Sequence, residues 1–239
     1  MPLGDDGGVS ASAPLPPAAE KARAVEEMFD RIAPRYELMN HLMTGGLDIL
    51  WRRRAVRELR LAPGSLVVDL ACGTGDLCRE LGRHGYRSIG VDSSAGMLAR
   101  ARGAERFLRA DILDLPLETA SVDGATSGFA LRNVTDIPRC AAEMARVVRP
   151  GGRIAVIDLA EARPVTRWIR STWVERVVPR LGALLSDGDA YRYLPASTAY
   201  LPQGEQLLAI FRAAGFRNVR RLLLGLGTVQ LLVGTRDRS

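Results

Sequence analysis

A glycine-rich turn between acidic residues is the segment of this chain best suited to ligand chemistry. The apolar run Leu66–Leu70 is followed by Gly73, Thr74 and Gly75, and Asp92 ends the next apolar segment. Glycine lets a backbone turn sharply and approach a ligand closely. An acid about 20 residues beyond such a turn commonly binds the two hydroxyls of a ribose. The sequence therefore predicts a nucleoside site.

The charges around the turn argue against a phosphate group. Asp69 precedes the turn, and Asp76 opens the following helix, where a pyrophosphate needs positive potential and free backbone donors. Cys78 stands where a dinucleotide turn prefers a third glycine. S-adenosylmethionine (SAM) has a sulfonium, an ammonium and a ribose diol but no phosphate, and the pattern resembles the SAM site of class I methyltransferases. A tight βα turn with solvated acids is the competing structural interpretation.

Alternating strands and helices must position these residues. Apolar segments predict strands at 66–70, 88–92, 106–110, 122–127 and 154–159, with helices at 76–84, 95–102 and 137–148 between them. A helix at 204–214 precedes strands 217–224 and 228–234, which we expect to pair as an antiparallel hairpin. This order predicts an α/β fold with a doubly wound, mostly parallel, seven-stranded sheet and helices on both faces, as in Rossmann-like class I methyltransferases.

The length of 239 residues suits a single domain with two appended segments. Residues 1–19 are rich in Gly, Ser, Ala and Pro and are predicted to be a disordered tail, which leaves 20–239 as the domain. Within it, 20–62 contains two predicted helices, from Glu20 to Pro34 and at Leu47–Leu59, and is expected to form a helical lid. The proline-interrupted segment 160–205 is interpreted as an insertion on the acceptor side.

The carboxyl ends of the strands should collect the ligand-binding residues, as in other open α/β sheets. Asp111 ends a strand and precedes Ile112, an arrangement suited to an adenine amino group and the face of its ring. Taken alone, Asp111 is as well explained as a turn cap. The predicted methyl-donor site comprises Asp69, Gly73, Thr74, Gly75, Asp92, Ser93, Met97, Asp111, Ile112 and Gly128.

Composition narrows the class of protein. The three cysteines lack CxxC spacing, which indicates a reducing compartment without a disulfide framework, and no cluster with metal-ligand spacing appears. No apolar signal segment opens the chain, and the stretch 222–234 is too short to span a bilayer, so we expect a cytoplasmic protein. Since no metal-ligand spacing appears, we also expect no metal.

The net charge of +6 could favour binding to anionic lipids or phosphates, although solvated helix faces explain the arginines as well. A nucleic-acid methyltransferase is less favoured, because no Asn/Asp-Pro-Pro-aromatic segment or Pro-Cys nucleophile is present.

Five further segments are more restrictive than the glycine turn: Tyr-Glu-Leu-Met-Asn at 36–40, Trp51, Phe-Ala-Leu-Arg-Asn-Val at 129–134, Arg-Pro-Gly-Gly at 149–152 and Tyr-Arg-Tyr-Leu-Pro-Ala-Ser at 191–197. Together they resemble the menaquinone/ubiquinone biosynthesis C-methyltransferase family over residues 25–234. The chain departs from that pattern at five positions. Thr44 and Ala160 stand where the family usually has serine, Asp48 where it has histidine, Ala130 where it has glycine, and Asp158 where it has glutamate. These departures leave the choice of acceptor open.

The resemblance implies SAM-dependent methylation of a ring carbon on a polyprenylated quinol, most simply demethylmenaquinol to menaquinol. It implies catalytic roles for Arg132 and Asn133 at a strand end, with Tyr36 and Asn40 in the lid against the acceptor. A structural ion pair for Arg132 and a core-edge position for Tyr36 are the competing interpretations. The alternatives are the polyprenyl-methoxybenzoquinol of ubiquinone synthesis, or a non-catalytic SAM-binding scaffold. A lipid-soluble acceptor implies transient contact with the membrane surface and no nucleic-acid partner, while a homodimer is left open.

Overall fold

The computed structural model describes residues 18–160, 201–202 and 204–238. Seven strands form one sheet in the order β3-β2-β1-β4-β5-β7-β6. Their bounds are β1 Leu66–Leu70, β2 Arg87–Asp92, β3 Arg106–Arg109, β4 Val122–Gly128, β5 Val148–Leu159, β6 Phe216–Leu224 and β7 Val229–Arg236. Strands β1 to β5 pair in parallel, and β7 lies antiparallel to both β5 and β6. The predicted fold class and the C-terminal hairpin are confirmed.

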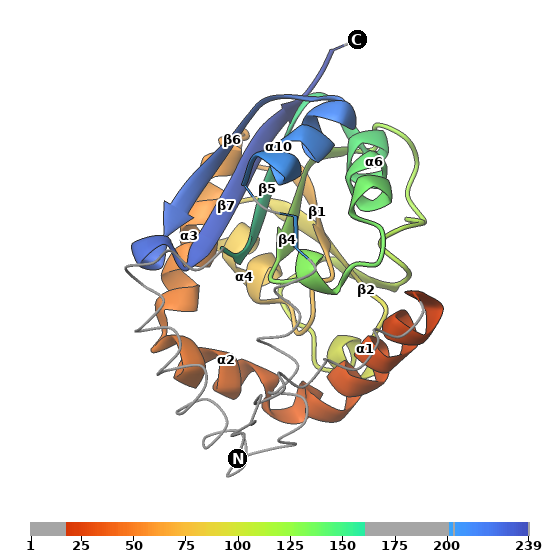
Figure 1. Cartoon of the computed structure of the whole chain (residues 1–239), viewed down its shortest axis with the longest axis vertical. Coiled ribbons are helices and arrows are strands. Elements are labelled where there is room, and N and C mark those ends of the chain that lie inside the picture. Colours follow the sequence, from red (N-terminus) through yellow and green to blue (C-terminus); the bar gives the residue numbers. More distant parts are fainter. Residues whose placement is uncertain (1–17, 161–200, 203, 239) are drawn as a thin grey trace, which may run out of the picture.

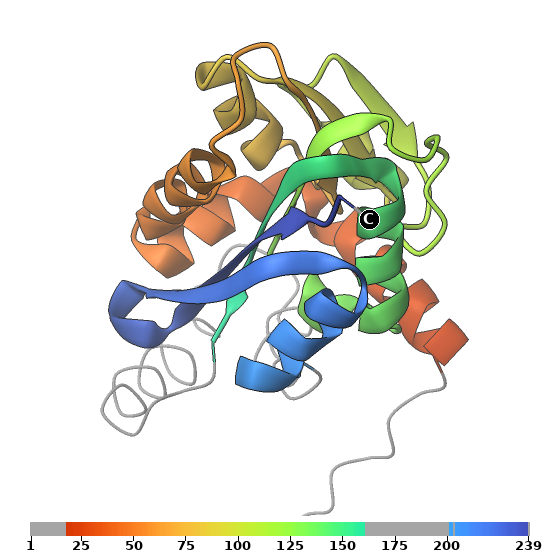
Figure 2. The same cartoon turned by 90° about the horizontal axis from the view of Figure 1, so that it is seen from above.

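The sheet is covered on both faces because neighbouring residues of each strand point to opposite sides. Val67 belongs to an apolar core that includes residues of α3 (Leu47–Leu59) and α4 (Asp76–Arg83), whereas Val68 belongs to a second core with residues of α6 (Ile137–Val147) and α10 (Gly204–Ala213). Figure 2 shows these two helix pairs on opposite sides of the sheet. The near-continuous apolar character of β1 is therefore what a parallel strand buried on both faces requires.

Strand order reverses at β1, whose neighbours are β2 on one side and β4 on the other. At such a switch point the connections leave the sheet in opposite directions and open a crevice at the carboxyl ends of the strands. The glycine turn after β1 lies at this point. Gly73 and Gly75 both have positive φ, of 56° and 89°, which side chains with a Cβ rarely adopt.

Four N-terminal helical segments precede the sheet; the first three lie below it in Figure 1, whereas the fourth packs on one of its faces. They are α1 (Ala18–Ile32), the short 3-10 helix η1 (Ala33–Arg35), α2 (Tyr36–Thr44) and α3. Gly45 and Gly46, with φ of 58° and 77°, end α2 and turn the chain into α3. The sequence did not predict α2, which carries Tyr36, Asn40 and His41.

Two boundaries differ from the predictions by four residues or more, and the others by at most two. Helix α5 covers only Ala95–Leu98, against the expected 95–102, because the chain turns away before Gly103. Strand β5 begins six residues earlier than the predicted 154, at Val148, because the expected turn at 149–152 is part of the strand: Val122 pairs with Val148 and Gly124 with Arg153, across a register shift. The predicted insertion falls largely outside the described residues, as does its segment 191–197, and the division into domains stays a prediction.

Candidate functional site

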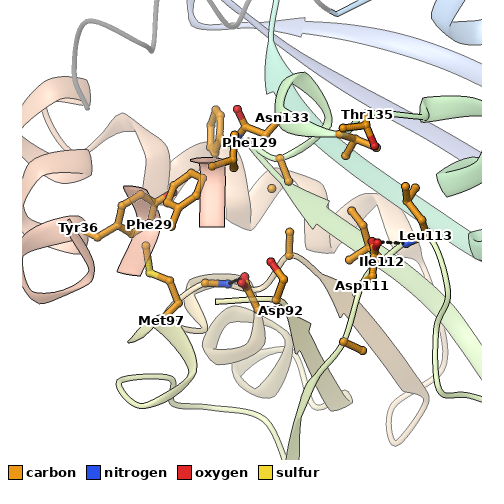
Figure 3. A pocket seen from close by; sticks show the side chains of 18 residues that line it. Phe29, Tyr36, Asp92, Met97, Asp111, Ile112, Leu113, Phe129, Asn133 and Thr135 are labelled. Atoms are coloured by element: carbon orange, nitrogen blue, oxygen red, sulfur yellow. Dashed lines mark hydrogen bonds between the residues drawn. The ribbon is translucent and has the colours of Figure 1, made fainter. Parts of the chain in front are cut away.

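A hollow at the carboxyl ends of the parallel strands brings most of the predicted site residues together (Figure 3). Its walls come from β1, β2, β3 and β4 and from the N-terminal helices. Seven of the predicted donor-site residues line it: Gly73, Asp92, Ser93, Met97, Asp111, Ile112 and Gly128. Tyr36 and Asn133, predicted to contact the acceptor, line the same hollow.

Asp92 is held rigidly at the end of β2. Its Oδ2 accepts a hydrogen bond from the Gly73 amide at 2.7 Å, and its Oδ1 accepts one from the Ser94 amide at 2.9 Å. Burial raises the pKa of this carboxyl, and the two backbone N–H groups oppose that shift. Each oxygen keeps a further lone pair for a hydroxyl donor. The arrangement suits a ribose diol lying against the glycine turn.

Asp111 and Ile112 follow β3 and lie next to each other in the wall of the hollow (Figure 3). Asp111 Oδ1 accepts a hydrogen bond from the Leu113 amide at 2.9 Å, so this carboxylate does cap a turn. The capped carboxylate still lines the hollow, and Ile112 supplies apolar surface beside it. The structural and the functional interpretations of Asp111 are therefore compatible.

A smaller hollow adjoins the first, and the two share Tyr36, Ala71, Gly73 and Gly128. Two of the three predicted donor-site residues that do not line the first hollow, Asp69 and Thr74, line this second one. Asp69 is fully buried and accepts hydrogen bonds from Thr126 Oγ1 at 2.7 Å and from Cys78 Sγ at 3.6 Å. Burial raises its pKa to about 7.

Asp76 also lines the second hollow, but its charge is compensated within the protein. Asp76 Oδ2 lies 3.1 Å from Arg52 Nη2, and Asp76 Oδ1 pairs with Arg79, which in turn contacts Glu37 at 2.9 Å. The sequence argument used Asp76 and Asp69 as carboxylates that disfavour a phosphate, and two arginines now offset the charge of Asp76. Among the described residues, Asp69 has no cation in direct contact.

Gly75 lines neither hollow. A Cβ at this position would lie 2.1 Å from the carbonyl oxygen of Arg102, so the residue is required for the close approach of two backbone segments. Its predicted contact with the donor stays a prediction.

Asn133 and Arg132 occupy the 3-10 helix η2 (Leu131–Asn133) after β4, and only Asn133 lines the hollow. Asn133 Oδ1 is buried without a hydrogen-bond partner among the described residues. Arg132 is buried instead against β5, where its Nη1 donates to Asp158 Oδ1 at 2.8 Å. The competing interpretation of Arg132, a structural ion pair, is thus the one this geometry favours, and its direct catalytic role stays a prediction.

The lid contributes aromatic surface. Phe29 on α1 and Tyr36 on α2 meet edge to face, with ring centroids 5.8 Å apart, and both line the first hollow opposite Phe129 (Figure 3). Asp30 fixes α1 in place by accepting hydrogen bonds from Ser94 and from the Gly96 amide, the latter at 2.8 Å. Asn40 lines neither hollow, and its predicted contact with the acceptor stays a prediction.

Sequence reasoning missed Phe29, Phe129 and Arg52 as site residues. Phe29 lies within the helix predicted from Glu20 to Pro34, where nothing marked it as a site residue, and Phe129 was used only as part of a motif. Arg52 was counted with surface arginines, although it is only 7 % exposed and lines the second hollow. Its spacing of four residues from Asp48 was the available signal, since acid and base at i and i+4 face each other on a helix.

The donor groups of the two hollows fit SAM. Asp92 suits the ribose, Asp111 and Ile112 suit the adenine, and the buried carboxyl of Asp69 suits a cation. Over the parts of the chain that the structure describes, no group of three or more His, Cys, Asp or Glu side chains could hold a metal ion.

Comparisons with known proteins identify the family of the chain. The model of the ubiE/COQ5 methyltransferase family matches residues 18–236. A "demethylmenaquinone methyltransferase" of Thermus thermophilus is 42% identical over 221 residues, covering 87% of this chain and 100% of that protein. A "ubiquinone/menaquinone biosynthesis C-methyltransferase UbiE" of Syntrophotalea carbinolica is 39% identical over 220 residues, covering 88% of this chain and 93% of that protein.

Solved structures support the fold. A SAM-dependent methyltransferase from Thermotoga maritima superposes with a TM-score of 0.63 at 23% identity, covering 88% of this chain and 99% of that one. At this identity the likeness concerns architecture alone. The family match and the two relatives, which extend over nearly the whole chain, decide the assignment: this chain belongs to the ubiE/COQ5 methyltransferase family.

Proposed function

We propose that the protein transfers a methyl group from SAM to a ring carbon of a polyprenylated quinol, converting demethylmenaquinol to menaquinol. Membership of a family of quinone-biosynthesis methyltransferases supports the reaction class. The name of the Thermus relative, demethylmenaquinone methyltransferase, supports the naphthoquinol acceptor over the benzoquinol.

The observation that carries the proposal is the unpartnered amide oxygen of Asn133 in the wall of the hollow. A buried acceptor without a partner costs roughly 1–3 kcal/mol, so such an atom is typical of a site that a ligand completes. A quinol hydroxyl would donate to this oxygen. The hydroxyl would then be oriented next to the ring carbon that takes the methyl group.

The chain supplies orientation and an apolar enclosure for the reaction. Bound SAM supplies an electrophilic methyl carbon, and the quinol ring becomes nucleophilic as its hydroxyl loses a proton. Phe29, Tyr36 and Phe129 offer aromatic surface on which a flat ring can pack. Arg132 acts as a positioning residue in this account, because its pairing with Asp158 fixes η2 and therefore Asn133.

The lid also presents apolar side chains to solvent. Helices α2 and α3 carry five exposed aliphatic side chains: Leu38, Leu42, Leu47, Ile49 and Leu50. Polyprenyl chains reside in lipid, and an apolar surface on a helical hairpin suits shallow contact with a bilayer. We therefore include transient membrane contact through α2 and α3 in the proposal. Among the described residues, no helix is long and apolar enough to cross a membrane.

Quinones extracted from cells that lack the gene test the acceptor. The proposal predicts that demethylmenaquinone accumulates and that the wild-type gene restores menaquinone, as measured by mass spectrometry. A wild-type quinone profile would contradict it. Accumulation of an unmethylated benzoquinol would favour the ubiquinone alternative, and restoration by a variant that cannot transfer methyl groups would favour the scaffold.

A further inference from the structure

A buried arginine, Arg52, lines the second hollow, and the contacts assigned so far to the adenine and the ribose do not involve it. Arg52 is only 7 % exposed and lines this hollow together with Asp69 and Gly73. It comes from α3, a helix of the N-terminal lid, and not from the sheet. A residue of an N-terminal helix thus lines the same hollow as the glycine turn.

Neighbouring groups hold the guanidinium of Arg52 in a fixed orientation. Nη1 pairs with Asp48 one turn earlier on α3, and Nη2 lies 3.1 Å from Asp76 Oδ2 on α4. The plane of Arg52 also lies over the Phe129 ring, with Cζ 5.6 Å from the ring centroid. Asp48 is itself oriented by Thr44, whose hydroxyl donates to it at 2.7 Å, and by His41 at 2.9 Å.

This fixed cation retains unused donors. A guanidinium has five N–H groups, and among the described residues its polar contacts are these two carboxylates. Arginine is well suited to bind a further carboxylate because its planar fork matches two oxygens.

The second hollow continues the first at the point where the nucleoside would end. With the adenine at Asp111 and the ribose at Asp92, the part of SAM beyond the ribose must pass Gly73 and Gly128, which both hollows share. That part is an amino acid with an ammonium and a carboxylate. The carboxyl of Asp69 and the guanidinium of Arg52 line the same hollow and do not pair directly with each other.

We propose that Arg52 binds the α-carboxylate of the methionine moiety of SAM, while Asp69 faces its ammonium. The lid helix α3 would then contact the donor directly. Asp48 and its partners Thr44 and His41 act as positioning residues for Arg52. The departures from the family pattern at Thr44 and Asp48 would therefore affect the binding of the methyl donor. The proposal rests on the methyl-donor assignment and is independent of which quinol is the acceptor.

Calorimetric titration with two ligands tests the proposal without any turnover. S-adenosylhomocysteine carries the carboxylate, and its decarboxylated counterpart keeps the amine but lacks that group. Hydrogen bonds to charged groups contribute roughly 1.5–3 kcal/mol, so the wild-type protein should prefer the carboxylate-bearing ligand by roughly 10- to 100-fold. Arg52→Ala should reduce this preference to within about threefold, and Arg52→Lys should keep part of it.

The control variant and the contrary outcomes are judged by the same quantity, the ratio of the affinities for the two ligands. Arg53→Ala, the next residue of α3, whose side chain is 45% exposed, should keep the wild-type preference. Equal weakening of both ligands by Arg52→Ala, or no change in either, would overturn the proposal. If that variant fails to fold, Arg52→Gln preserves the length of the side chain and is judged by the same ratio. A wild-type protein that binds neither ligand would refute the donor site itself, whereas failure with the quinol alone would leave this proposal standing.

Discussion

Arg132 and Asp158 form a buried ion pair that joins the helical turn after β4 to the end of β5. Arg132 Nη1 lies 2.8 Å from Asp158 Oδ1, and the Arg132 amide donates to Asp158 Oδ2 at 3.2 Å. Both side chains are almost completely buried. A motif residue expected in the catalytic machinery and a position that departs from the family pattern are thus partners in one structural contact.

Loss of Arg132 should therefore destabilise the protein. Arg132→Ala leaves the Asp158 carboxylate buried without its cation, and breaking such a pair typically costs about 3–5 kcal/mol. The free energy of unfolding in urea measures this change. The double variant Arg132→Ala, Asp158→Ala should lose much less than the sum of the two single losses, because the two residues are in contact. Additive losses, or a single loss below about 1 kcal/mol, would refute the structural role.

Asn133 should affect methyl transfer more than donor binding. Removal of one well-placed hydrogen-bonding group typically lowers the rate by about 10²- to 10³-fold. Asn133→Ala should show such a fall in single-turnover rate, with an unchanged melting temperature and nearly unchanged affinity for S-adenosylhomocysteine. A variant that folds and reacts at the wild-type rate would remove Asn133 from the acceptor site.

Asp92 should be required for donor binding. Asp92→Ala removes the proposed ribose contacts and leaves the Gly73 amide unpaired, which should weaken binding of S-adenosylhomocysteine by about 1–3 kcal/mol. Calorimetric titration provides the affinity. Glu105→Ala, which removes only an exposed ion pair with Arg87, is the matched control and should bind normally. Unchanged affinity in Asp92→Ala would place the ribose elsewhere.

Asp69 should make stability depend on pH. Burial raises its folded-state pKa from 3.8 to about 7, so between these values the folded protein holds a proton that the unfolded chain releases. The stability from this group is therefore fully present below about pH 4 and is lost as the pH rises through about 7. The loss amounts to at most about 4 kcal/mol, at 1.36 kcal/mol for each pKa unit.

The comparison of wild type with Asp69→Asn isolates this contribution. The difference in their free energies of unfolding should shift in favour of the Asn variant between pH 5 and pH 8. A difference that stays constant with pH would contradict the raised pKa.

The sheet could be predicted from the sequence because each strand is marked by a short run of apolar residues and each helix by apolar residues at helical spacing. The strand Leu66–Leu70 and the helix Leu47–Leu59 were predicted with their observed bounds. Helix α2 was missed because its nine residues follow Pro34 closely and end at two glycines, so the segment resembled a loop. Residues at the carboxyl ends of the strands were found since the parallel topology places those ends together.

Pairings between distant elements could not be predicted. Arg52 contacts Asp76 across two helices, and Arg132 contacts Asp158 across neighbouring strands. Nothing in the spacing of either pair distinguishes these arginines from the many exposed ones. The pairing of Asp76 with Arg52 could not be foreseen for the same reason.

The central claim is most directly tested with SAM that carries a CD₃ methyl group and a reduced, short-chain demethylmenaquinol analogue. Purified protein should transfer the CD₃ group, and NMR of the product should show it on the ring carbon, with both oxygens unmethylated. The Asn133→Ala variant should form this product far more slowly. Absence of transfer, or a CD₃ group on a quinol oxygen, would contradict the account.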